Sequence, residues 1–429
     1  MSDSQMSRIK DRRPFDCLVL SGGGAKGAFG AGAARAVLAY RALRKRGPAD
    51  ICFLGTSSGA LNAAVLAAWA DDGPSRLNAL WSKVDAMNVL GGTPGKKRTL
   101  CRLVWRAIKP SDNFSVFDAD SLRAVVRGAL DKLNFEEFQK RAHLIIVATD
   151  YSAGRLARFY SSSLLDRFIA KDIEEAKLAN NARPKLNRFK RITSMDMLVD
   201  CLLASAAIPL LFPLVPMDGH WYGDGGIGNN TPVQEAALLM RALNEWSDDL
   251  CAADTFCVFQ HPSNTANRVE KRGLLEIAAA TYDLVHELHL GPILGSWLQI
   301  NASLVEHERN LREFVDAMER MSIAQKDKEA LRELCREHLS RLGGHAPRLV
   351  LPLHEIRPSG DLGGVLAFDA PQSHDAEGYT ATVDTLFNKQ LIQPHQKDTL
   401  QASLLNGLGG GGAFGVSGTT AIKEGAGGR

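Results

Sequence analysis

Residues 15–27 read FDCLVLSGGGAKG, a short apolar run that passes directly into three glycines. Such a run predicts a buried strand that ends at a tight loop. Residues 28–46 are rich in alanine and lack proline, which predicts a helix. A second apolar run, 51–54, is followed by a further alanine-rich segment, 61–69, that also predicts a helix. Alternation of strand and helix in this order indicates a parallel sheet covered by helices.

The remaining sequence adds strands and helices of ordinary length. Apolar runs predict strands at 143–148, 156–160, 255–259 and 349–353. Helical spacing predicts helices at 197–207, 233–243 and 375–387. The turn dipeptide Asp218-Gly219 predicts a hairpin between 210–215 and 220–222.

The composition is that of an ordinary globular protein. With 429 residues, 45% of them hydrophobic and 23% charged, the chain can bury one large α/β core or two smaller ones. The net charge is +3 and the basic residues are dispersed among acidic ones, which argues against nucleic-acid binding. Seven cysteines are scattered without a C-x-x-C pair, which favours reduced, buried thiols over disulfides or a zinc site.

No segment predicts export or membrane crossing. Residues 1–14 are polar, with basic residues and no apolar run behind them, so a secretory signal is not expected. The longest stretch of small apolar residues, 60–70, has about half the length that a bilayer span needs. We therefore expect a cytoplasmic protein that contacts membranes only peripherally.

The loop after the first strand is Gly22-Gly23-Gly24-Ala25-Lys26-Gly27. Glycines let the backbone approach a ligand closely, and the helix N-terminus that follows adds partial positive charge. The loop can therefore hold a phosphate or the oxyanion that develops during acyl transfer. A dinucleotide site would need an acidic residue about 20 residues later. The chain instead has the basic, helical stretch 40–45 there, which disfavours a dinucleotide.

The second motif is a G-x-S-x-G sequence, Gly55-Thr56-Ser57-Ser58-Gly59. A serine on a sharp strand-to-helix turn must adopt strained backbone angles, and its neighbours two residues away must be small. The motif lies directly between an apolar run and an alanine-rich segment, where such a turn belongs. Its placement predicts that Ser57 is an exposed nucleophile, and the alternative is a turn without chemical importance.

The third motif, Asp224-Gly225-Gly226, offers a carboxylate in a tight loop. A serine hydroxyl needs an adjacent base before it attacks an ester. A buried carboxylate can serve directly if its pKa rises toward neutrality. A histidine held by an acid is the commoner solution, and His220, His261 and His354 follow the serine in the chain. None of these histidines has so constrained a local sequence as Asp224.

Together the three motifs resemble those of patatin-like phospholipases, in the same order and at about the same separations. Shorter similarities support the resemblance, at Ala148-Thr149-Asp150, Ala204–Pro209, Phe212-Pro213, Asp218-Gly219 and Asn230-x-Pro232. The similarity is firm over about residues 15–240, looser to about 390 and absent in the tail. Lys26 stands where the family has Arg or Lys, and Gly226 where many members have Ala.

The resemblance implies a three-layer α/β/α sandwich with a mostly parallel sheet, and a Ser57–Asp224 dyad. Ser57 would attack the carbonyl carbon of an acyl lipid, such as a phospholipid, and Asp224 would take its proton. Backbone N–H groups of residues 22–27 would form the oxyanion hole, and Lys26 would steady that loop. The resemblance implies neither a metal nor an organic cofactor. Two alternatives remain: an acyltransferase or thioesterase on this fold, and a non-catalytic nucleotide-sensing or scaffold protein.

The same resemblance sets the expected organisation of the chain. We expect a flexible N-terminus over 1–13 and one hydrolase domain over 14–392, with the core motifs in 15–240. Within that domain, 272–342 would form a helical extension and 348–388 a closing strand and helix. The glycine-rich tail, 406–429, cannot bury enough apolar surface to offset its ordering entropy, so we expect it to be disordered.

Two basic segments are candidates for surface recognition. Residues 97–109 (KRTLCRLVWRAIK) separate basic from apolar side chains at helical spacing, which suits either an anionic membrane interface or an ordinary half-buried helix. Residues 183–191 form a second basic run, which we expect to be a surface loop. The oligomeric state is left open by the sequence.

Overall fold

The computed structural model describes residues 12–69, 72–85, 117–178, 188–262, 351–364 and 370–408, with single positions and short pieces between them. Its centre is a nine-stranded sheet in which seven strands follow the order β5-β4-β3-β2-β1-β8-β9. The strands are β1 (Arg13–Leu20), β2 (Ile51–Thr56), β3 (Leu144–Asp150), β4 (Arg155–Ser161), β5 (Phe189–Arg191), β6 (Val215–Met217), β7 (His220–Asp224), β8 (Leu250–Val258) and β9 (Leu353–Ile356). The run from β3 through β2, β1 and β8 to β9 is parallel, whereas β4, β6 and β7 add antiparallel pairs.

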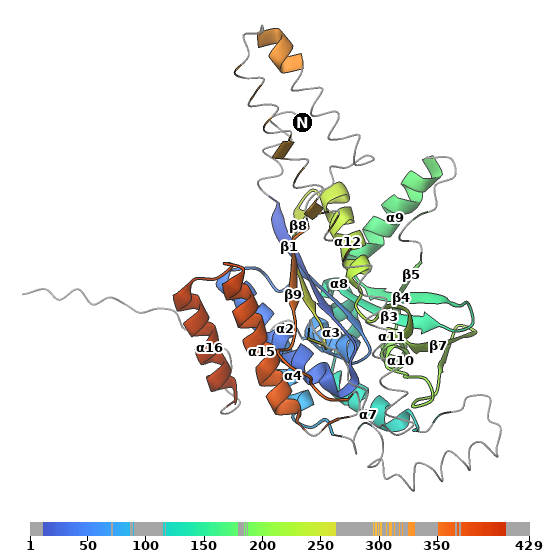
Figure 1. Cartoon of the computed structure of the whole chain (residues 1–429). Coiled ribbons are helices and arrows are strands. Elements are labelled where there is room, and N and C mark those ends of the chain that lie inside the picture. The colour runs from blue at the N-terminus through green and yellow to red at the C-terminus, as the bar shows by residue number, and fades with distance from the viewer. Residues whose placement is uncertain are drawn as a thin grey trace, which may run out of the picture.

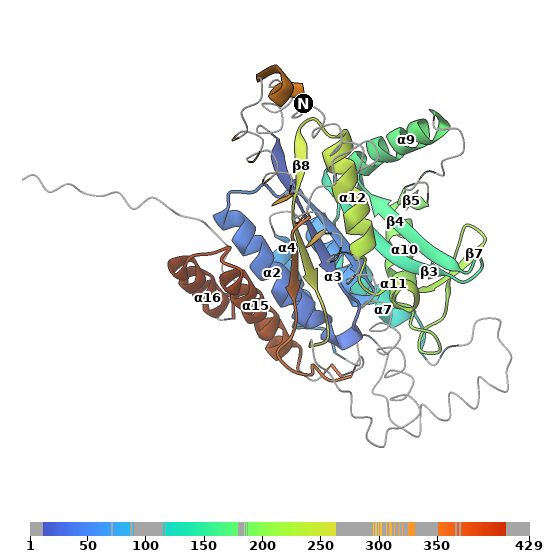
Figure 2. The same cartoon turned by 45° about the horizontal axis from the view of Figure 1, so that its top comes forward.

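Helices cover both faces of this sheet (Figures 1 and 2). They are α2 (Gly27–Leu43), α3 (Ser58–Ala68), α4 (Gly73–Trp81), α7 (Asp120–Ala129), α8 (Phe135–Arg141), α9 (Ser163–Leu178), α10 (Met195–Ser205), α11 (Gly226–Asn229), α12 (Val233–Trp246), α15 (Pro371–Asn388) and α16 (Pro394–Leu408). Alternate residues of β1 divide between two apolar clusters. Leu18 and Leu20 pack with α2, α3, α10 and α15, whereas Phe15, Cys17 and Val19 pack with α9 and α12. This division produces the three-layer α/β/α sandwich with a mostly parallel sheet that the sequence predicts.

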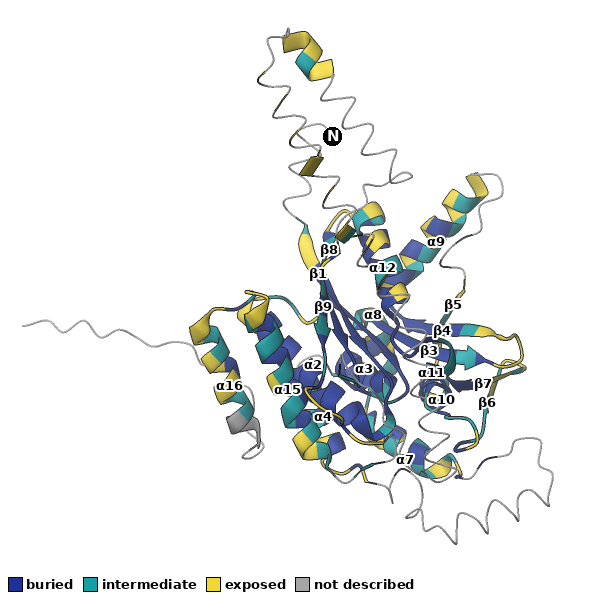
Figure 3. Ribbon diagram, in the orientation of Figure 1, coloured by how far each residue is buried: buried dark blue, intermediate teal, exposed yellow. Residues whose placement is uncertain are grey.

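Burial follows these layers closely (Figure 3). The strands at the centre of the sheet are buried on both faces, as parallel strands between two helix layers must be. Helices α2 and α3 are buried almost all round, whereas outer helices such as α9 bury one side and expose the other (Figure 3). No helix of the described residues is both long and apolar enough to cross a bilayer.

Helices α2 and α15 come from distant parts of the chain and pack backbone to backbone. A side chain on Gly32 would lie 1.8 Å from the main-chain oxygen of Asp375, and one on Gly378 would lie 2.0 Å from that of Phe29. Arg35 of α2 also forms a buried ion pair with Asp375 of α15. Burial raises the pKa of Asp375, and the Arg35 cation opposes that rise.

The predicted hairpin is present but shorter than expected. Asp218 and Gly219 both have positive φ, 49° and 75°, which suits a two-residue turn between β6 and β7. The strand before the turn begins at Val215, so the strand prediction for 210–214 is wrong. Pro209 and Pro213 limit backbone pairing there, and Leu210 adopts a turn conformation with φ 67°.

The predictions for the second basic run and for the C-terminal tail differ from the structure in part, and other predictions fall outside the described residues. Residues 189–191 of the second basic run form β5 and pair with β4, so the prediction of a surface loop is wrong at this end of the run. Helix α16 continues to Leu408 and therefore enters the stretch that we expected to be disordered from 406. Residues 1–11, 97–109 and 409–429, and most of 272–342, lie outside the described residues.

Candidate active site

Ser57 occupies a strained turn between strand β2 and helix α3. Its backbone angles are φ 56° and ψ −128°, a region that L-residues seldom occupy. The flanking glycines are required by close packing. A side chain on Gly55 would lie 2.3 Å from the oxygen of Gly59, and one on Gly59 would lie 2.2 Å from that of Leu20. The motif therefore has the strained geometry of a nucleophile turn. Ser57 is nevertheless buried, with 4% of the residue exposed, so the prediction of an exposed serine is wrong.

The ends of strands β2 and β7 meet beside strand β3. Strand β2 is parallel to β3 and ends with Thr56 opposite Val147. Strand β7 is antiparallel to β3 and ends with Asp224 opposite Ala148. Strand β4 pairs with one edge of β3 along its whole length. Strands β2 and β7 therefore share the opposite edge, where β2 pairs with residues 144–147 and β7 with residues 148–150. Ser57, which follows Thr56, and Asp224, which ends β7, are thus brought close together by two strands that run in opposite directions beside β3.

Ser205, at the end of α10, links the two strand ends. The N–H of Ser57 donates to the Ser205 hydroxyl at 2.9 Å, and that hydroxyl donates to the oxygen of Val147 at 2.6 Å. The main-chain oxygen of Ser205 accepts from the N–H of Gly225 at 3.3 Å. A fully buried side chain thereby fixes the serine turn to β3, while the main chain of the same residue holds the Asp224 loop.

Asp224 is fully buried, with 0% of the residue exposed. The N–H of Gly226 donates to its Oδ1 at 2.7 Å and orients the carboxylate. A side chain on Gly225 would collide with the oxygen of Val147 at 2.2 Å, so this loop requires glycine next to the acid. Burial raises the pKa of Tyr151, and the negative charge of Asp224 raises it further.

The glycine loop abuts Ser57 from the other side. A side chain on Gly22 would lie 2.9 Å from the Cβ of Ser57. The N–H of Gly22 donates to the main-chain oxygen of Asn230. The side-chain amide of Asn230 donates in turn to the main-chain oxygen of Gly22, at 3.1 Å. The N–H groups of Lys26 and Gly27 donate within the loop, to the oxygens of Gly23 and Gly24 respectively.

Of the six predicted oxyanion-hole residues, Gly23, Gly24 and Ala25 therefore keep N–H groups that these main-chain bonds do not engage. Gly24 needs glycine, because its φ is 55°, and it lines the same pocket as Ser57. Lys26 is buried, with 1% exposed, at the base of the loop. Helix α2 begins directly after this loop, so its partial positive charge faces the same region.

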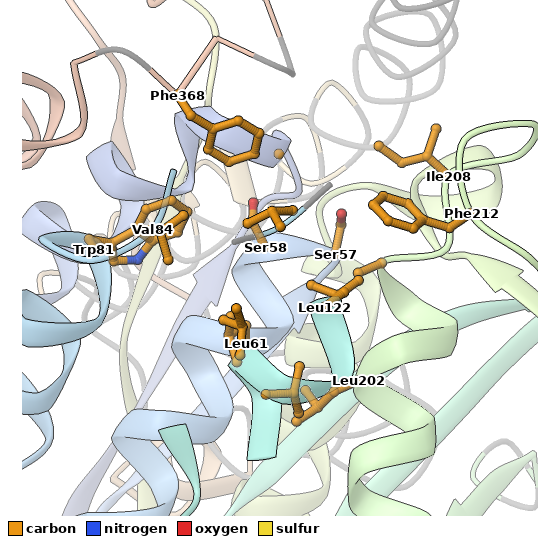
Figure 4. A pocket seen from close by; sticks show the side chains of 15 residues that line it. Ser57, Ser58, Leu61, Trp81, Val84, Leu122, Leu202, Ile208, Phe212 and Phe368 are labelled. Atoms are coloured by element: carbon orange, nitrogen blue, oxygen red, sulfur yellow. The ribbon is translucent and has the colours of Figure 1, made fainter. Parts of the chain in front are cut away.

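A pocket with an apolar lining opens at Ser57 (Figure 4). Ser57 and Ser58 are the hydroxyl-bearing residues of its lining among those that the structure describes. Figure 4 shows Phe368 and Trp81 on one side of the two serines and Ile208 and Phe212 on the other, with Leu61 and Leu202 below. The shape and chemistry suit an apolar chain attached to a group that reacts at Ser57.

The three alternative histidines lie in different surroundings. His354 hydrogen-bonds to Asp254, and Arg46 forms ion pairs with both Asp254 and Asp16. Asp16 pairs with Ile51, the first residue of β2, whereas Ser57 follows the last residue of that strand, so this group lies toward the opposite end of the strands. His220 bonds to Asp150 at 3.0 Å and lies four residues before Asp224, about 13 Å along the strand. His261 follows the carboxyl end of β8, and Ser57 follows the carboxyl end of the parallel strand β2. Because both lie at the same end of the parallel strands, His261 remains the histidine that could serve as the base.

The sequence analysis assigned no role to Ser205 or Asn230, although both contact the motifs. The signal for Ser205 is a serine within an alanine-rich helix end, Ala204–Ala207, directly before Pro209. The signal for Asn230 is its position six residues after Asp224. Neither signal identifies a partner, because the bonds join segments far apart in the chain.

Three comparisons with known proteins bear on the family of this chain. No curated protein matches the chain. Among solved structures, that of VipD from Legionella pneumophila is similar, with 14% identity, a TM-score of 0.38, and coverage of 88% of this chain and 67% of VipD. The family model described as patatin-like phospholipase matches residues 18–237, which is about half of the chain and includes all three motifs. The chain therefore belongs to the patatin-like phospholipase family.

Proposed function

We propose that the protein hydrolyses the carboxylic esters of phospholipids or related glycerolipids, with Ser57 as nucleophile and Asp224 as base. The observation that carries the proposal is the meeting of β2 and β7 beside Val147 and Ala148, at the opening of an apolar pocket. A carboxylate next to the serine can take its proton without an intervening histidine. The buried position of Asp224 favours this role, because burial disfavours its charged form.

The proposed reaction has two halves. The Ser57 oxygen attacks the ester carbonyl carbon while its proton passes to Asp224, and the resulting oxyanion accepts hydrogen bonds from N–H groups of Gly23, Gly24 and Ala25. Collapse of this intermediate expels the alcohol, which takes the proton from Asp224. Water then loses a proton to Asp224 and attacks the acyl-enzyme. Collapse of the second intermediate releases the fatty acid, and Asp224 returns its proton to the Ser57 oxygen, which regenerates the free serine.

The pocket supports an acyl chain as the part of the substrate that is bound. Apart from Gly24 and the two serines, the lining residues that the structure describes all carry apolar side chains. Burial of each methylene of an acyl chain contributes about 0.8 kcal/mol, so such a lining binds long chains well. Contact with a membrane at its surface, in the cytoplasm, fits this substrate class and is part of the proposal.

Mass spectrometry of lipids tests the proposal directly. Wild-type protein incubated with phosphatidylcholine should release free fatty acid and lysolipid, whereas Ser57→Ala should release neither and Asp224→Asn should be at least about 100-fold slower. An unchanged rate in Ser57→Ala would refute the nucleophile. If an added alcohol were acylated in preference to water, the same acyl-enzyme would serve as an acyltransferase.

A further inference from the structure

The turn that leads from α10 to β6 has an unexpected residue at its tip. The N–H of Leu211 donates to the oxygen of Ile208 at 3.0 Å, with Pro209 second in the turn and Leu210 third. Leu210 has φ 67°. A hydrogen-bonded turn with proline second and positive φ third is of type II, which favours glycine or asparagine at the third position. This chain has a branched apolar residue there instead.

Leu210 is also exposed to solvent. Of the residue, 60% is accessible, so neither its conformation nor its exposure is favourable for leucine. A bulky residue at positive φ costs of the order of a kilocalorie or more, and such strain is found at functional sites. The cost and the exposure together indicate a side chain with a role outside the folded core.

The two ends of this turn are part of the candidate active site. Ile208 and Phe212 both line the pocket at Ser57, and they lie on the same side of it (Figure 4). The turn between them therefore connects the pocket wall to solvent. Near the end of this segment, Leu214 and the half-exposed Tyr151 share the space over Gly223, which extends the apolar surface toward β7.

We propose that Leu210 inserts into the surface of a lipid bilayer and holds the mouth of the Ser57 pocket against it. The proposal rests on the proposed function, because a long-chain acyl lipid resides in an aggregate rather than in free solution. Such a substrate can enter the pocket only if the pocket wall touches the aggregate. Among the described residues of this wall, Leu210 is an apolar side chain exposed to solvent, and its burial in acyl chains would favour binding.

The test compares Leu210→Asn with a matched change elsewhere. Asparagine is close to leucine in size, tolerates positive φ and is polar. Leu178→Asn is the control, because Leu178 is 80% exposed at the end of α9, which extends away from the sheet (Figure 1). Partition onto phosphatidylcholine vesicles should fall at least about tenfold in Leu210→Asn and stay at the wild-type level in Leu178→Asn.

Two further readouts separate lipid contact from folding and catalysis. Leu210→Gly removes the strain as well as the side chain, so it should unfold at the wild-type temperature or higher while it loses vesicle binding as Leu210→Asn does. Turnover of a soluble short-chain ester should be unchanged in both. Vesicle partition of either variant within twofold of wild type would overturn the proposal, as would failure of the wild type to bind vesicles or a parallel loss of soluble turnover. Failure of the proposed function would show separately, as lipid turnover retained in Ser57→Ala.

Discussion

In the proposed dyad, a third residue fixes the turns that carry Ser57 and Asp224. The side-chain hydroxyl of Ser205 accepts the Ser57 N–H, and its main-chain oxygen accepts the Gly225 N–H. The glycine-flanked motifs single out Ser57 and Asp224 as candidates, because strained turns require glycine at particular positions, and the family resemblance implies that the two form a dyad. The motifs do not predict Ser205, because the role of a buried hydroxyl depends on which distant groups the fold brings to it.

Replacement of Ser205 by alanine should lower kcat more than it changes KM. The change leaves the N–H of Ser57 without its acceptor and frees the serine turn to move, which should cost about 1–3 kcal/mol of stability. We expect kcat for a soluble ester to fall about 10- to 100-fold, since small displacements of reacting groups have effects of this size. Steady-state kinetics on the folded protein measure both constants.

Ser161→Ala is the matched control for this change. Ser161 is also a buried serine, but its hydroxyl has no hydrogen-bond partner in the described part of the chain. Removal of that hydroxyl should leave kcat unchanged and stability equal or higher. Equal kinetic effects of the two substitutions would show that Ser205 has no positioning role.

At the scale of elements, the packing of α15 on α2 connects the C-terminal region to the candidate site. Phe368 lines the pocket three residues before α15 begins at Pro371. Helix α15 is held against α2 by glycine contacts and by the buried Arg35–Asp375 pair. The sequence predicts α15 from its spacing, but its partner helix is not predictable, because the small residues that permit the contact lie about 340 positions apart.

Gly378→Ala tests this contact. The new methyl group would lie 2.0 Å from the oxygen of Phe29, so α15 must move away from α2. We expect a loss of at least about 1–3 kcal/mol in the free energy of unfolding and a lower rate with soluble esters, because Phe368 would move with the helix. Thermal denaturation and ester assays measure the two effects.

Gly128→Ala in α7 is the control for the Gly378→Ala substitution in α15. Beyond the backbone of α7 itself, the described residues place no atom within 4 Å of the position that its new methyl group would take. Because alanine favours a helix over glycine, this variant should be as stable as wild type or more stable, by up to about 1 kcal/mol. If Gly378→Ala behaved in the same way, the close contact of α15 with α2 would be refuted.

At the scale of the whole molecule, the buried central strands and their parallel arrangement follow from alternation and burial, which the sequence displays well. Apolar runs such as Phe15–Leu20 and Leu144–Ala148 predict the buried parallel strands correctly. Short edge strands such as β5, and helices rich in charge such as α9, were not predicted. Their stability comes from tertiary contacts rather than from a strong local pattern.

The stability of the folded protein should fall in mild acid through His143. Burial lowers the pKa of this histidine from 6.5 to about 4, and the nearby Arg167 cation contributes to the lowering. In the unfolded chain, His143 binds a proton below pH 6.5, whereas in the folded protein it remains neutral until the pH falls to about 4. Stability present above pH 6.5 is therefore lost as the pH falls toward 4, by up to about 3 kcal/mol.

Urea denaturation between pH 7 and pH 4 measures this loss. His143→Gln should flatten the dependence, whereas His395→Gln, at an exposed position on α16, should keep the wild-type slope. An identical slope in wild type and His143→Gln would exclude His143 as the cause.

The most direct measurement of the central claim is the mapping of a fluorophosphonate adduct by mass spectrometry of peptides, because only an activated serine reacts. The account predicts an adduct on Ser57 in the wild type, none in Ser57→Ala, and labelling at least about 100-fold slower in a folded Asp224→Asn protein. An adduct on another residue would contradict the assignment of Ser57. Labelling of Asp224→Asn at the wild-type rate would contradict the dyad and direct attention to His261 as the base.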